Sequence, residues 1–229
     1  MNQEAGRAAQ QLNHEMDTYL LFPRLVEFTE RLASANTVRQ RVAEYATGHV
    51  LELASPAGSN HWHYPRSITS LTCIVAPHAN LQRRIRGLPF PMDARAGAFD
   101  HLPVQDHAFD CVVSTFAIGT ARDVVPTLRE IQRVLKPSGY LLFAEYGLSR
   151  EPRIETWQRR LRPLHQLLLG TRAPMTYFEE KLTAAGFAIK RCECTSLARI
   201  PRALGVVYEG VAALDSSTEL FANSVGRNG

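Results

Sequence analysis

Apolar runs of strand length alternate with helical patterns along most of this 229-residue chain. The strand-length runs fall at 49–53, 70–75, 109–116, 140–145, 187–194 and 205–213. The first four are largely apolar at successive positions, as strands are when a parallel sheet is covered on both faces. Apolar residues recur at helical spacing over 124–135, 154–169 and 178–185. This alternation predicts an α/β fold, with a mostly parallel sheet and helices on both faces, whose ligands bind beyond the carboxyl ends of the strands.

The length suits one sizeable core and is short for two domains. We expect an N-terminal helical cap over residues 1–45, an α/β domain over 46–214 and a loose polar tail over 215–229. No apolar run approaches the roughly 20 residues that cross a bilayer, and the N-terminus lacks the pattern of a signal peptide. We therefore expect a cytoplasmic protein with no membrane span.

The formal net charge of +4 comes mostly from arginine. One cluster holds Arg83, Arg84 and Arg86, and a second holds Arg150, Arg153, Arg159, Arg160 and Arg162. Either cluster can be a solvated helix face or a surface for an acidic ligand. No basic motif interleaved with aromatic residues accompanies them, so nucleic acid is not an expected partner. Pro163 is expected to bend or split the helix that carries the second cluster.

The four cysteines give little support for a metal site. Cys73 and Cys111 lie inside apolar runs and are expected to be small buried hydrophobes. Cys192 and Cys194 would point to the same face of a strand, which leaves metal or redox chemistry open. No second cysteine or histidine pair stands at ligand spacing, so we expect no metal.

Residues 49–60 have the pattern of a buried strand, a tight turn and the start of a helix. In nucleoside-binding α/β domains such a turn is usually rich in glycine, because the backbone bends sharply and lets the ligand approach closely. Glu52 and Gly58 fit that pattern, whereas Ala54 and Pro56 replace glycines. The strand, turn and helix pattern predicts a nucleoside cofactor, bound at a turn with fewer glycines than usual.

Two later motifs carry a family resemblance. Residues 106–110 read acid-x-x-Phe-Asp and lead into an apolar strand, and residues 133–139 read Arg-x-Leu-Lys-Pro-x-Gly. With the Leu-Pro pair at 102–103, they resemble class I S-adenosylmethionine-dependent methyltransferases. Residues 157–163 and 206–211 resemble the thiol methyltransferase-like branch. The resemblance covers most of the chain, and it implies a Rossmann-like class I methyltransferase fold.

The resemblance also implies S-adenosylmethionine as the cofactor. The positions that would surround it are Glu52, Ala54, Ser55, Gly58, Ala76, Ala98, Phe99, Ser114 and Phe116. Glu52 would orient the amino group. Ala76 and Ala98 stand where the family usually has the ribose and adenine aspartates, although Asp100 could substitute for the second. Two lost carboxylates would cost about 3–6 kcal/mol, against about 8 kcal/mol for a micromolar ligand. Backbone groups, water or stacking on Phe99 would have to compensate.

Tyr146 and His165 are the candidate catalytic residues that the resemblance implies. The Tyr146 hydroxyl would orient a substrate, and His165 could act as a base, since its ordinary pKa is near 6.5. Both also fit plain packing roles. The expected function is methyl transfer to sulfur or oxygen of a small molecule. The alternatives are a non-methylating enzyme on the same fold, or a non-catalytic protein that binds a protein partner.

Overall fold

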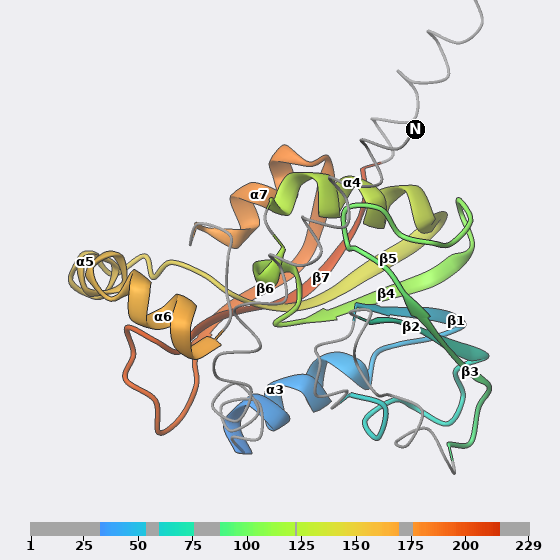
Figure 1. Ribbon diagram of the computed structural model, residues 1–229, viewed down its shortest axis with the longest axis horizontal. Helices are drawn as coiled ribbons and strands as arrows, with labels where there is room; N and C mark the ends of the chain where they lie inside the picture. The colour runs from blue at the N-terminus through green and yellow to red at the C-terminus, as the bar shows by residue number, and fades with distance from the viewer. Residues whose placement is uncertain (1–32, 54–59, 76–87, 122, 170–175, 216–229) are drawn as a thin grey trace, which may run out of the picture.

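The computed structural model describes residues 33–53, 60–75, 88–121, 123–169 and 176–215 (Figure 1). A seven-stranded sheet has the order β3-β2-β1-β4-β5-β7-β6. The strands are β1 (His49–Leu53), β2 (Ser70–Val75), β3 (Met92–Ala96), β4 (Phe109–Thr115), β5 (Leu135–Tyr146), β6 (Phe187–Ser196) and β7 (Val206–Leu214). The helices are α3 (Ala33–Ala43), η2 (Ile118–Thr120), α4 (Val124–Val134), α5 (Pro152–Arg160), α6 (Arg162–Leu169) and α7 (Phe178–Ala184).

The sheet confirms the predicted fold class. Strands β3, β2, β1, β4 and β5 are parallel neighbours, and β7 lies antiparallel between β5 and β6. Sequence reasoning did not find β3. This strand lies at an edge of the sheet, and its sequence over 92–96, Met-Asp-Ala-Arg-Ala, leaves each side chain half-buried or exposed. An edge strand of that kind has no apolar run to reveal it.

Helices cover both faces of the sheet (Figure 1). On one face, Leu51, Leu128 and Phe143 belong to a core that includes residues of α4 and α7. On the other face, Val50 and Leu142 belong to a core that includes residues of α3. Successive strand residues point to opposite faces, so β1 and β5 each contribute to both cores. Because β3, β2, β1, β4 and β5 are parallel, their carboxyl ends lie at the same edge of the sheet, between the helices that cover its two faces.

The two sequence motifs are joined in space beside α4. The Arg133 guanidinium donates to the Asp106 carboxylate at 2.5 Å and to Glu130 Oε2 at 2.7 Å, and it also reaches the backbone carbonyl oxygens of residues 102 and 104. Lys136 Nζ donates to Asp110 Oδ1 at 2.6 Å. The motifs thus fasten the start of β4 to the end of α4 and the start of β5.

The chain after β5 forms two short helices rather than one. α5 ends at Arg160 and α6 begins at Arg162, next to Pro163, as the sequence predicts. Proline lacks a backbone N–H and its ring crowds the preceding turn, so a continuous helix is interrupted there. None of the helices in the described ranges is both long and apolar enough to cross a membrane.

Candidate functional site

Glu52 lies at the carboxyl end of β1 and is 2% exposed. The thiol of Cys73, its neighbour on β2, donates to Glu52 Oε2 at 3.5 Å. Burial raises the pKa of Glu52, while Cys73, Tyr64 and Asn60 oppose that rise through hydrogen bonding. The side chain is therefore a buried carboxyl group at the strand ends, and its predicted role towards a cofactor stays a prediction.

Asn60 extends the polar surroundings of Glu52 towards β4. Its Nδ2 donates to Thr115 Oγ1 at 2.7 Å, and both residues are buried. Its Oδ1 is buried and accepts no hydrogen bond from the residues that the structure describes. A buried acceptor usually has a partner, so Asn60 marks a place where a donor fits.

Four of the predicted cofactor positions lie outside the described residues: Ala54, Ser55, Gly58 and Ala76.

Arg39 is a site residue that the sequence reasoning missed. It is 1% exposed, and its guanidinium carbon lies 5.1 Å from the centroid of the Phe116 ring. Burial raises the pKa of Glu52, and the positive charge of Arg39 opposes that rise; burial and the same charge together lower the pKa of His63. A signal was present in the sequence, because Arg39 stands four residues from both Ala35 and Ala43 on the buried face of α3. A charge on the apolar face of a helix needs a partner.

The Glu145 carboxylate shapes the loop after β4. Its Oε1 accepts from Ser114 Oγ at 2.6 Å, and from the backbone N–H groups of residues 117 and 118 at 3.1 and 3.0 Å. Its Oε2 accepts from the N–H of residue 119 at 3.2 Å. Burial raises the pKa of Glu145, and these donors oppose the rise. Ser114 was predicted as a cofactor contact, and its hydroxyl donates its hydrogen bond to Glu145.

Phe116 leaves this loop in a left-handed conformation, with φ at 59°. Its ring centroid is 4.7 Å from that of Tyr146, and the Tyr146 ring is 5.1 Å from the ring of His165. The structure therefore brings Phe116 together with both candidate catalytic residues. His165 is 1% exposed, and burial lowers its pKa to about 4. Its imidazole is neutral at pH 7.

Ala98 and Phe99 follow β3, and both are half-buried. Ala98 forms an isolated bridge with His101. Phe99 packs partly against the core on the α4 side, and Asp100 is exposed. Ala98 and Phe99 have no carboxylate, and the carboxylate of Asp100 is exposed, so none of the three residues offers a buried carboxylate in place of the adenine aspartate.

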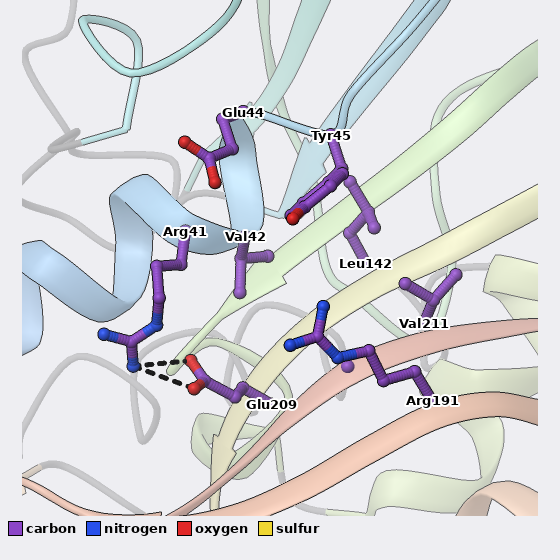
Figure 2. Close-up of a pocket in the computed structure, with 9 residues that line it drawn as sticks. Arg41, Val42, Glu44, Tyr45, Leu142, Arg191, Glu209 and Val211 are labelled. Atoms are coloured by element: carbon purple, nitrogen blue, oxygen red, sulfur yellow. Dashed lines mark hydrogen bonds and ion pairs between the residues drawn. The ribbon is translucent and has the colours of Figure 1, made fainter.

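A pocket lies on the α3 side of the sheet, above β5 and β7 (Figure 2). Arg41 crosses it to the Glu209 carboxylate, with Nη2 at 2.8 and 3.0 Å from the two oxygens. Arg191 points into the same pocket and donates to Glu193. The Arg41–Glu209 pair ties α3 to β7, and it thereby fixes the helix that carries Arg39.

Residues 45–143 match the family described as Methyltransferase domain. YodH, an uncharacterized methyltransferase of Bacillus subtilis (strain 168), is 30% identical over 124 residues, which are 52% of this chain and 52% of the relative. Thiol S-methyltransferase TMT1B of Rattus norvegicus is 32% identical over 122 residues, which are 50% of this chain and 49% of the relative. The chain thus spans about half the length of these curated relatives.

The fold has solved counterparts. The Burkholderia thailandensis 1,6-didemethyltoxoflavin-N1-methyltransferase, solved with 1,6-didemethyltoxoflavin and S-adenosylhomocysteine, superposes with a TM-score of 0.61 at 16% identity. The alignment covers 91% of this chain and 88% of that chain. At such low identity, the similarity concerns the fold alone.

Proposed function

We propose that this chain is a class I S-adenosylmethionine-dependent methyltransferase and that it transfers a methyl group to a small thiol. The match of residues 45–143 to the methyltransferase family and the similarity to YodH support this proposal. The observation that carries the proposal is the buried Glu52 at the end of β1. Asn60 lies beside it, and it interacts electrostatically with the positive charge of Arg39. Ligands of open α/β sheets bind at this edge.

The residues present fit the amino-acid portion of S-adenosylmethionine. Glu52 and the unmatched Oδ1 of Asn60 are acceptors for an ammonium group, and Arg39 is a cation for a carboxylate. The adenosine portion has less support, since Ala76 and Ala98 offer no carboxylate. We therefore expect binding that is weaker than usual for the superfamily.

When bound, S-adenosylmethionine supplies an electrophilic methyl group on a sulfonium. The rings of Phe116 and Tyr146 lie beside each other at this edge, and aromatic faces stabilise nearby positive charge. The loop that carries Phe116 is held by Glu145, so the ring keeps a fixed place. Much of the rate in such a reaction comes from holding the nucleophile in line.

The protonation states favour sulfur over oxygen. His165 has a pKa of about 4, so it is a weak base at neutral pH. Its ring stands at 89° to that of Tyr146, where it orients the phenol that we assign to the substrate. A thiol, with an ordinary pKa near 8.5, ionises without a strong base, whereas an alcohol does not. The name of the TMT1B relative agrees with this choice.

The test is methyl transfer from labelled S-adenosylmethionine to a small alkyl thiol and to a matched phenol. We expect product with the thiol, and a drop of about tenfold or more in kcat for Tyr146→Phe if its hydroxyl orients the substrate. The exposed Tyr45→Phe is the matched control. Methylation of the phenol alone would contradict the assignment to sulfur.

The missing carboxylates favour one alternative, a protein of this fold that no longer methylates and binds another ligand or a protein partner. It predicts no methylated product and no affinity for S-adenosylmethionine, even though the chain folds. Calorimetry with the cofactor separates the two proposals.

A further inference from the structure

α5 exposes a basic and aromatic face that the proposed function does not use. Arg153, Trp157 and Arg160 stand at positions i, i+4 and i+7, so they share one side of the helix. All three are exposed, with Trp157 at 55%, and the Arg160 guanidinium lies 5.6 Å from the Trp157 ring centroid. Gln158, on the other side of the helix, is buried and bonds to the backbone of residues 147 and 149.

α6, the next helix along the chain, adds two more exposed residues of this kind. Arg162 is exposed and Leu164 is 40% exposed, directly before the buried His165. We call the set of Arg153, Trp157, Arg160, Arg162 and Leu164 the Trp157 face. Its three arginines form no ion pair with any residue in the described ranges, whereas Arg150 and Arg159 beside them are paired with Glu179 and Glu155. The positive charge of the Trp157 face is therefore not neutralised by those residues.

The Trp157 face is held in a fixed place rather than on a loose segment. Gln158 Oε1 accepts from the backbone N–H of residue 149 at 2.7 Å, and its Nε2 donates to the carbonyl oxygen of residue 147 at 2.9 Å. These bonds fasten α5 to the end of β5. The two helices project beyond the sheet (Figure 1).

We propose that the Trp157 face docks on the surface of an anionic lipid bilayer. Arginines that form no ion pair with the described residues attract anionic headgroups, and tryptophan prefers the boundary between headgroups and acyl chains. Two projecting short helices, one with an exposed indole and the next with an exposed leucine, suit insertion to that depth. A strand of nucleic acid would favour a basic groove with several stacking aromatics, and this face has a single aromatic ring.

The docking places the candidate site beside the bilayer. His165 of α6 packs on Tyr146, so the helix that carries Arg162 and Leu164 of the Trp157 face also forms a wall of the site. A thiol dissolved in the membrane would then have a short path to Tyr146. This consequence rests on the proposed function, whereas the docking itself does not.

The chain has only two tryptophans, which makes the test direct. Trp62→Phe leaves Trp157 as the single reporter, and Trp157→Phe leaves Trp62, which is 65% exposed. The full chain is titrated with vesicles of equal parts phosphatidylserine and phosphatidylcholine. We expect a blue shift of the emission for Trp157 and none for Trp62. An equal shift of both, or no shift of Trp157, would overturn the proposal.

Charge reversal tests the arginines by vesicle co-sedimentation. Each arginine near an anionic surface contributes roughly fivefold to partitioning, so Arg153→Glu with Arg160→Glu should weaken binding by at least about 25-fold. The matched control is Arg66→Glu with Arg129→Glu, two exposed arginines away from α5, for which we expect a loss below about threefold.

Three outcomes would each overturn the proposal. They are equal losses of binding for the two arginine pairs, undiminished binding to pure phosphatidylcholine vesicles, and a stronger Trp157 response to an RNA oligonucleotide than to anionic vesicles. If the glutamate pair does not fold by circular dichroism, the Arg→Gln pair replaces it, with an expected loss of about tenfold or more. The binding needs no S-adenosylmethionine, so its failure is distinct from failure of the proposed function.

Discussion

At the scale of single residues, the buried carboxylate of Glu145 holds the loop that follows β4. It accepts from Ser114 and from the backbone N–H groups of residues 117–119. Glu145→Gln turns one acceptor into a donor that faces these N–H groups. We expect a loss of about 2–4 kcal/mol in the free energy of unfolding by urea. Glu44→Gln, at an exposed position, should change it by less than about 0.5 kcal/mol.

His165 gives the site a pH dependence of known sign. Burial lowers its pKa from 6.5 to about 4, so between these values the unfolded chain binds more protons than the folded chain. Stability from this residue therefore falls as the pH drops from 6.5 to 4, by up to about 3 kcal/mol. His165→Gln should lose less stability than the parent over that range in urea titrations. The exposed His101→Gln should follow the parent; identical curves for His165→Gln and the parent would contradict the burial of an uncharged imidazole.

Single residues were also where sequence reasoning was least complete. Glu52 was singled out because it fits the strand, turn and helix pattern over 49–60, and its role towards a cofactor, which the family resemblance implies, stays a prediction. Arg39 was missed because its role depends on Phe116, 77 positions later in the chain, and no local pattern joins them. The hydroxyl of Ser114 was placed at the right strand end, but its partner Glu145 follows from the register of β4 and β5.

At the scale of elements, the motifs at 106–110 and 133–139 connect β4, α4 and β5 through ion pairs and hydrogen bonds. Arg133 binds Asp106, Glu130 and two backbone carbonyls. Arg133→Lys keeps the charge but loses the planar set of donors. We expect a loss of about 2 kcal/mol in the free energy of unfolding. Arg129→Lys on the exposed side of α4 is the control, and a similar loss there would show that the network contributes nothing specific.

Element types followed from periodicity where burial is strong. The continuous apolar runs predicted β1, β2 and β4, and Pro163 predicted the break between α5 and α6. β3 was missed because an edge strand with few buried side chains shows no such run. The antiparallel direction of β7 also lies beyond periodicity, since a run of apolar residues has no direction.

At the scale of the whole molecule, the residues at the strand ends fit the amino-acid half of the proposed cofactor better than its adenosine half. Ala76, outside the described residues, stands where a ribose-binding aspartate is usual in the family that the sequence resembles. Ala76→Asp should tighten S-adenosylmethionine about tenfold, because one charge-assisted hydrogen bond contributes about 1.5 kcal/mol. Calorimetry checks this, with Ala76→Asn as an isosteric control that gains less.

The most direct test of the account is calorimetric titration of the parent protein and Glu52→Gln with S-adenosylmethionine. We predict saturable binding with a Kd below about 1 mM for the parent. Glu52→Gln should bind at least about tenfold more weakly while its unfolding stays cooperative. No binding by the parent at millimolar cofactor, or equal binding by both proteins, would contradict the claim that the strand ends around Glu52 hold this cofactor.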